Sequence, residues 1–278
     1  MRIKEIVCAL ERFAPLPLQD GFDNSGLQIG LTEAEATGAL LCLDVTEAVI
    51  DEAIALGYNL VISHHPLIFK GYKSITGKDY VERCIMKAIK NDIVIYSAHT
   101  NLDNAPEGVN FKIAEKIGLT HVRVLEEKDN ALLNLVTSVP DFYPMQNSWN
   151  QAGAGVIGEL ETPETELEFL KRVKKTFEAG CLKHNKLMGR EIQTVALCGG
   201  AGAFLIPSAI RKRADVFITG EIKYHDYFGH DADILLAEIG HYESEQYTKE
   251  IFYTVIRELF PNLALQQCKV NTNPIKYL

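Results

Sequence analysis

The chain has 278 residues, of which 47% are hydrophobic and 23% are charged, which is the composition of a globular protein rather than a disordered or fibrous one. This length suffices for one large domain or two smaller ones, and we expect two. The formal net charge of −9 argues against tight binding to nucleic acid or to an anionic membrane, because both attract basic surfaces. No apolar stretch approaches the roughly 20 residues that a membrane-spanning helix needs.

The cysteines are scattered and form no CxxC pair. Several lie in apolar runs, which favours buried, reduced thiols over disulfides or a zinc site. We therefore expect a soluble, cytoplasmic protein, with cysteines at positions Cys8, Cys42, Cys84, Cys181, Cys198 and Cys268.

The N-terminal half alternates predicted helices and strands. Apolar residues at helical spacing predict an amphipathic helix near the N-terminus, over residues 3–13, and not a signal peptide. The segment DGFDNSG is expected to be a loop. Strands are predicted over 39–45, 59–63 and 93–98, with helices over 46–57 and 81–90 between them. Thr46 can cap the first of these two helices, which should end at Gly57. This alternation predicts a parallel sheet covered on both faces.

The same pattern returns in the second half. Helices are predicted over 164–178, 204–212 and 241–259, and strands over 194–200, 215–220 and 233–240. The middle of the chain contains a predicted strand over 132–138, a Pro-Asp turn and a glycine-containing segment, VIGEL. Two halves rich in strand–helix units predict an α/β protein with a duplicated domain.

Three predicted strands run directly into residue types that bind metal ions. NLVIS leads to His64 and His65, IVIYSA leads to His99 and Asp103, and DILLAEIG leads to the HYESE segment. Ligands of open α/β sheets bind at the carboxyl ends of the strands, so the three clusters can converge. We therefore expect a metal centre formed by His64, His65, Asp103, His241 and Glu245.

The spacing of these residues suggests two ions rather than one. Neighbouring side chains at a strand end point in different directions, so His64 and His65 suit two adjacent ions. His241 and Glu245 are four residues apart and share one face of a helix. A carboxylate can bridge two ions, and Glu245 is the expected bridge.

The mixed set of imidazoles and carboxylates suits zinc, iron, manganese or cobalt, and argues against calcium. Two dications and two carboxylates leave a local positive charge, which favours an anionic or electron-rich substrate. Water with a lowered pKa would be the nucleophile.

Other segments allow two interpretations. His99, Lys223 and His225 can assist a reaction by contacting substrate or moving protons, or they can be ordinary packing and solvated loop residues. The segment Gly199–Gly202 follows a strand and opens a helix, so its backbone N–H groups can cradle a phosphate. Close packing of helix on strand explains these glycines equally well.

Motifs along the whole chain resemble the GTP cyclohydrolase 1 type 2 homologue family, also called the Nif-three family. These motifs are, in order, DNSGLQIG, CLDVTEAVIDEAI, SHHPLIF, AHTNLDNAPEGVN, GVIGEL, CGGAG, TGEIKYHD and GHYESE. The resemblance implies two similar, intertwined, three-layer α/β/α domains, a homohexamer, and a dinuclear metal centre. The expected domains are residues 1–128 plus about 245–278, and residues 129–244. The domain that some relatives carry in mid-chain is expected to be absent.

Carried over by residue, the resemblance implies that His65 and Asp103 bind one ion, that His64 and His241 bind the other, and that Glu245 binds both. It suggests a metal-dependent hydrolase that acts on an anionic or nucleotide-like substrate. The alternative is a non-catalytic, metal-binding hexameric scaffold that acts through partners or in metal handling.

Overall fold

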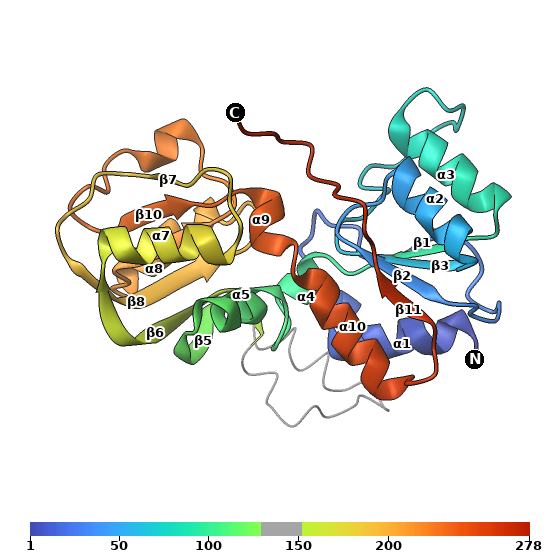
Figure 1. Ribbon diagram of the computed structural model, residues 1–278, viewed down its shortest axis with the longest axis horizontal. Helices are drawn as coiled ribbons and strands as arrows, with labels where there is room; N and C mark the ends of the chain where they lie inside the picture. Colours follow the sequence, from blue (N-terminus) through green and yellow to red (C-terminus); the bar gives the residue numbers. More distant parts are fainter. Residues whose placement is uncertain (129–151) are drawn as a thin grey trace. The chain divides into compact units, whose positions relative to one another are not determined.

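The computed structural model describes residues 1–128 and 152–278, which form two compact α/β units (Figure 1). The first unit contains Met1–Leu102 and Thr248–Thr272. The second contains residues 103–128 and 152–247 together with Asn273–Leu278. Residues 103–128, which the sequence placed in the first domain, are grouped with the second unit because β5 (Thr120–Glu127) pairs with β6 (Gly153–Thr165). The predicted strand 132–138 lies outside the described residues.

The first unit contains a five-stranded sheet in the order β1–β4–β3–β2–β11. Its central strands run parallel to one another, and every residue in them is buried. β11 extends the parallel part, whereas β1 pairs antiparallel with β4. The strands are β1 (Gly26–Ile29), β2 (Ala39–Cys42), β3 (Leu60–Ser63), β4 (Val94–Ser97) and β11 (Leu265–Gln267).

Helices cover both faces of this sheet, with α2 and α3 on one side and α1 and α10 on the other (Figure 1). The hydroxyl of Thr46 accepts a hydrogen bond from Val49 N at the start of α2, and Gly57 ends the helix in the left-handed conformation, at φ +68°. The unit therefore has three layers. Its helices are α1 (Ile3–Phe13), η1 (Leu16–Leu18), α2 (Glu47–Leu56), α3 (Tyr80–Lys90) and α10 (Thr248–Leu259), and α4 (Thr100–Asp103) lies at the boundary.

The second unit contains a six-stranded sheet in the order β5–β6–β8–β9–β10–β7. Only β8, β9 and β10 run parallel, because β6 is antiparallel to both of its neighbours and β7 is antiparallel to β10. The parallel pairing predicted for the central strands is confirmed in the first unit, and each unit also has antiparallel strands at its edges. The remaining strands are β7 (Lys183–His184), β8 (Glu191–Cys198), β9 (Val216–Thr219) and β10 (Leu235–Glu238).

Helices also cover both faces of the second sheet. α5 and α7 contact β6 and β8, whereas η3 and α8 contribute apolar side chains to a core on the opposite face. The predicted helix 204–212 corresponds to η3 and α8 together. The helices are α5 (Val109–Ile117), α7 (Glu166–Thr176), η3 (Ala203–Leu205), α8 (Ile206–Arg211), η4 (Tyr224–Tyr227) and α9 (His241–Glu245).

The single helix predicted over 241–259 is two helices, α9 and α10, which belong to different units. Between them, Gln246 Nε2 donates to the carbonyl of Phe177, and the hydroxyl of Tyr247 donates to the carbonyl of Thr176. These bonds tie the junction to the end of α7. No glycine or proline marks this break, because the residues between the two helices are Gln246 and Tyr247.

All six cysteines are free, and four of them are buried, whereas Cys8 and Cys181 are exposed. In the described part of the chain, no helix combines the length and the apolarity that crossing a bilayer requires.

Candidate metal-binding residues

His64 and His65 directly follow the buried strand β3 and continue its pairing with the neighbouring strand. Their backbone N–H groups donate to the carbonyls of Cys42 and Leu43. His64 Nδ1 lies 2.8 Å from the carbonyl oxygen of Ala98. Because a carbonyl oxygen can only accept, Nδ1 carries the proton, and Nε2 is the nitrogen that a metal ion would bind.

His65 is oriented in the same way by a carboxylate. Its Nδ1 lies 2.7 Å from Asp44 Oδ1, and Asp44 Oδ2 accepts a hydrogen bond from the Thr272 hydroxyl at 2.6 Å. Burial opposes ionisation of Asp44, but the nearby His65 and the hydrogen bonds from His65 and Thr272 outweigh burial and lower the pKa of this carboxyl group. Asp44 therefore stays ionised and holds the His65 ring through Nδ1.

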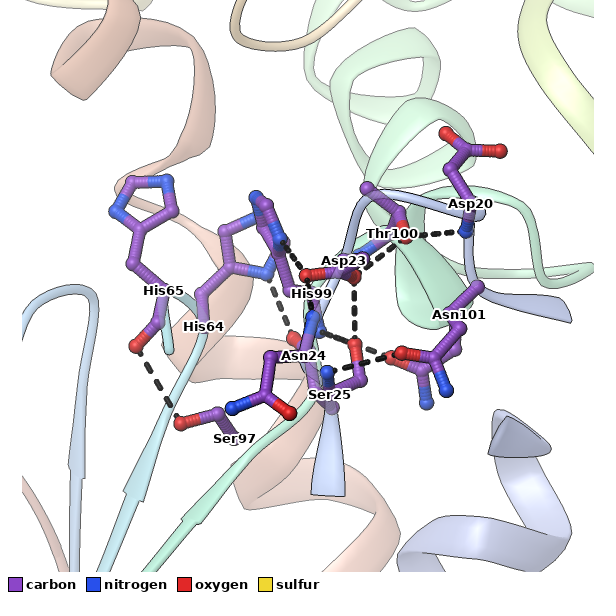
Figure 2. Close-up of polar contacts among 12 residues, drawn as sticks. Asp20, Asp23, Asn24, Ser25, His64, His65, Ser97, His99, Thr100 and Asn101 are labelled. Atoms are coloured by element: carbon purple, nitrogen blue, oxygen red, sulfur yellow. Dashed lines mark hydrogen bonds and ion pairs between the residues drawn. The ribbon is translucent and has the colours of Figure 1, made fainter. Parts of the chain in front are cut away.

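His99 follows β4 and is held by Asp23, whose side chain is buried. His99 Nδ1 lies 2.8 Å from Asp23 Oδ1, and the same carboxylate accepts bonds from the backbone and hydroxyl of Thr100 and from the Ser25 hydroxyl (Figure 2). Burial raises the pKa of Asp23, but these hydrogen bonds and the nearby His99 reverse the effect and bring the pKa far below its ordinary value. Asp23 is thus a fixed anionic anchor for His99.

The first unit therefore brings three imidazole rings together at the ends of two neighbouring strands. His64, His65 and His99 each offer a ring nitrogen, and these nitrogens lie within 4.8 Å of one another. Ring centroids are separated by 4.9 to 5.4 Å. Figure 2 shows the three side chains gathered beside the Asp23 anchor. Three clustered imidazole nitrogens are a donor set that can hold a transition-metal ion.

The second unit carries a separate set of donors on α9. His241 Nε2 lies 3.1 Å from Glu245 Oε2, as expected for residues four apart on a helix. His241 Nδ1 lies 2.8 Å from Glu221 Oε1, so this ring too is anchored through Nδ1. Glu221 is contributed by the loop after β9.

Asp103 lies beside Glu245 in the same unit. One carboxylate oxygen of each residue lies within 4.8 Å of the other. Asn110 Nδ2 donates to the backbone carbonyl of Asp103 at 3.0 Å, which fixes the end of α4. Two adjacent carboxylates repel each other when both are ionised, and a cation bound between them relieves that repulsion.

All four histidines thus share one arrangement, in which Nδ1 bonds to a protein acceptor and Nε2 is the remaining donor atom. Protein acceptors that orient a metal-binding imidazole in this way are typical of zinc and iron sites. The imidazoles of the first unit suit a divalent transition metal, and so do His241, Asp103 and Glu245 of the second unit. The residues present therefore fit a metal site.

The glycine segment after β8 owes its composition to close packing. The N–H groups of Gly200 and Gly202 already donate to the hydroxyls of Ser244 and Thr219, so they are not available to cradle a phosphate. A Cβ atom at Gly200, where φ is +58°, would lie 2.4 Å from Glu245 Oε1. Glycine here allows α9 and its carboxylate to approach the loop. Of the two interpretations, the structure favours packing.

Lys223 and His225 line a cavity of about 550 Å³ in the second unit. They lie at the start of η4 and within it. Glu221, the anchor of His241, lines the same cavity. Its walls are formed by Ala201, Ala203, Phe204, Ile206, Pro207, Glu221, Lys223, His225, Asp226, Phe228 and His230.

Sequence reasoning missed the three carboxylates that orient the histidines. Asp44 and Glu221 follow strands, as the candidate ligands do, so the strand-end argument could have found them. Asp23 precedes a short edge strand and is 76 residues from His99 in the sequence, and no local pattern signals that contact.

The fold and these residues define an α/β protein with candidate metal-binding groups of histidine, aspartate and glutamate. A family model described as Duf34/NIF3 (NGG1p interacting factor 3) matches residues 1–274, and the chain belongs to this family.

Relatives share both the sequence and the fold. A GTP cyclohydrolase 1 type 2 homolog of Lactococcus lactis is 31% identical, with 99% of this chain and 98% of the relative covered. A protein of the same name from Clostridium acetobutylicum is 32% identical over 88% of this chain and 85% of its own length. A hypothetical protein of Staphylococcus aureus has a crystal structure that matches with a TM-score of 0.87 and 29% identity, covering 100% of this chain and 99% of that one.

Proposed function

We propose that the chain binds two divalent metal ions through His64, His65, Asp103, His241 and Glu245, and that it uses them for hydrolysis. The observation that carries this proposal is the shared anchoring of the histidines, each of which is held by a protein acceptor at Nδ1, so that Nε2 is the nitrogen a metal ion would bind. Histidines that only pack in a core have no need for one common orientation.

In this proposal His65 and Asp103 bind one ion, His64 and His241 bind the other, and Glu245 contacts both, as the family resemblance implies. Glu245 suits this role because its carboxylate has two oxygens and it lies close to both His241 and Asp103. Divalent ions held in this way act as Lewis acids and allow water to act as a nucleophile near neutral pH.

The remaining residues have supporting roles. Asp44 and Glu221 keep His65 and His241 in the required tautomer. His99, fixed by Asp23, is placed to hydrogen-bond a substrate beside His64 and His65. Lys223 supplies a positive charge that suits an anionic substrate. The relatives named GTP cyclohydrolase 1 type 2 homolog support a nucleotide-like substrate.

A substrate screen tests whether the metal site is catalytic. The metal-loaded chain would be tested against nucleotides, phosphoesters and peptides, together with Glu245→Gln and, as a control, a variant of the exposed residue Glu161, Glu161→Gln. We expect turnover that is lost on chelation, restored by added metal and absent in Glu245→Gln only. Metal bound at full occupancy without turnover of any compound would favour the non-catalytic metal-binding scaffold.

We further propose that the chain assembles as a homohexamer in the cytoplasm and does not bind nucleic acid or membranes tightly. The family resemblance and the net charge of −9 support this proposal. Light scattering should give six times the mass of the chain, with or without metal, whereas a stable monomer would contradict the assembly.

A further inference from the structure

The cavity in the second unit is built by two segments that the proposed metal site does not use. One segment runs through η3 and the start of α8, and the other surrounds η4. Its volume of about 550 Å³ falls in the range of small-molecule binding sites, roughly 300–1,000 Å³. A ligand of the size of a nucleotide can therefore fit.

Aromatic side chains form an exposed wall of this cavity. Phe204 is 65% exposed and Phe228 is 62% exposed, although both are large and apolar. The His225 ring stacks on Phe228 with an interplanar angle of 30°. Flat, solvent-exposed rings offer a surface on which a planar aromatic ligand can stack.

Polar side chains line the same cavity. Neither Lys223 Nζ nor the Asp226 carboxylate has a hydrogen-bond or ion-pair partner among residues 1–128 and 152–278. Lys223 can only donate, and it attracts an anion, whereas an ionised Asp226 can only accept, including from two neighbouring N–H groups. A ligand that suits both residues carries an anionic group and N–H donors.

Glu221 links the cavity to the proposed metal site. Its side chain lines the cavity, and its Oε1 accepts a bond from His241 Nδ1 at 2.8 Å. A molecule in the cavity can therefore contact Glu221, which in turn bonds to His241, a proposed metal ligand.

We propose that this cavity binds a planar nitrogen heterocycle that carries an anionic group. Phe204 and Phe228 stack on the ring, Asp226 accepts hydrogen bonds from its N–H groups, and Lys223 pairs with the anion. The role of the cavity in a reaction rests on the proposed function, but binding to it does not.

Calorimetry with three nucleic-acid components tests this assignment. Guanosine 5′-monophosphate has the ring, adjacent N–H donors and the anion, adenosine 5′-monophosphate lacks that donor arrangement, and guanosine lacks the anion. We expect guanosine monophosphate to bind the full-length chain most tightly. Phe228→Ala should weaken its binding about tenfold or more. Asp226→Asn should bind guanosine monophosphate no more tightly than adenosine monophosphate. Lys223→Ala should bind guanosine monophosphate no more tightly than guanosine.

Two exposed residues on α7, outside the cavity lining, supply matched controls. Lys171→Ala and Leu167→Ala should leave binding of guanosine monophosphate unchanged. The proposal is overturned if the wild-type chain does not bind guanosine monophosphate, or if Phe228→Ala and Lys223→Ala bind it as tightly as the controls do. A Phe228→Ala variant that changes only the mass of the assembly would instead assign this face to contact with a second copy.

Counting metal in the same samples separates this inference from the proposed function. Nucleotide binding without bound metal would retain the cavity assignment and reject the metal centre. Two bound metal ions without nucleotide binding would retain the metal centre and reject the cavity assignment.

Discussion

Glu221 accepts a hydrogen bond from His241 Nδ1 at 2.8 Å, and the same side chain forms part of the cavity wall beside Lys223. One carboxylate therefore meets a candidate metal ligand and a candidate substrate pocket. A change at Glu221 should affect metal binding even though Glu221 is not itself a proposed ligand.

Replacing Glu221 by Ala should weaken binding of the ion that His241 holds by about 10–100-fold, because His241 loses the acceptor that fixes its tautomer. Glu221→Gln should lose less, since the amide oxygen can still accept the bond. Titration against a competing chelator measures the change, with Glu161→Gln as the control. Equal metal affinity in Glu221→Ala and wild type would show that this hydrogen bond does not support metal binding.

Metal stoichiometry tests the bridging role of Glu245. His64→Ala and His65→Ala should each keep about one ion per chain, whereas Glu245→Ala should approach none, because only Glu245 serves both ions in the proposed site. His99→Ala should keep two. Elemental analysis of the purified, folded variants decides between these outcomes. Two ions per chain in Glu245→Ala would contradict the bridging role of Glu245. Loss of an ion in His99→Ala would assign that ion to the three histidines of the first unit.

Close packing at Gly200 can be separated from backbone strain with a second glycine. Gly229 also has positive φ, at +84°, but a Cβ atom there would meet nothing within 4 Å. Gly229→Ala should therefore cost only about 1 kcal/mol of unfolding free energy, from the left-handed backbone. Gly200→Ala should cost about 1–3 kcal/mol more, because its Cβ would clash with Glu245. Denaturant unfolding measures the loss of unfolding free energy in both variants. Equal losses would contradict the close approach of Glu245 to Gly200.

Glu82 gives the first unit a predictable response to acid. Its buried carboxylate accepts bonds from the backbone N–H groups of Thr76 and Lys78 and from the Thr76 hydroxyl, and it pairs with Lys78 Nζ. These bonds, that from the Thr76 backbone most of all, outweigh desolvation and lower the pKa of Glu82 from 4.5 to about 2. A lowered carboxyl pKa stabilises the folded state above the unfolded pKa, and this stabilisation is lost as the pH falls through the folded pKa.

Glu82→Gln should therefore lower the melting temperature at pH 7, and its difference from wild type should shrink as the pH falls from about 4.5 towards 2. Thermal unfolding at a series of pH values measures this difference. Glu258→Gln, at an exposed position of the same unit, is the control. A difference that stays constant over this range would show that the ionised form of Glu82 contributes no stability.

The central strands and the longer helices could be predicted because their signals are local. Thr46 and Gly57 mark the two ends of α2, and four-residue buried strands read as short apolar runs. The edge strands β1, β7 and β11 were missed because each is short and gains its pairing from residues distant in the sequence. The break between α9 and α10 was missed because the residues between them, Gln246 and Tyr247, include no glycine or proline.

The candidate ligands were also predictable in part. Polar residues after buried strands are visible in the sequence, and the structure brings the rings of His64 and His65 together, as that argument requires. His99 was expected near the same edge of the sheet, but not as a ligand. The contact of His99 with His64 and His65 depends on Asp23, which positions the His99 ring through a bond across 76 residues. Packing and long-range hydrogen bonds, rather than sequence pattern, decide such details.

The common Nδ1 anchoring also makes each candidate ligand spectroscopically visible. A hydrogen bond of 2.7–2.8 Å slows the exchange of an imidazole N–H proton with water, most of all for the buried His64, and such a proton gives its own resonance in a proton NMR spectrum. One such proton lies on Nδ1, the nitrogen that faces away from an incoming ion, in each of His64, His65, His99 and His241. An ion that binds Nε2 withdraws electron density from that ring and shifts the signal. The occupancy of every imidazole donor can therefore be followed separately in the unmodified protein.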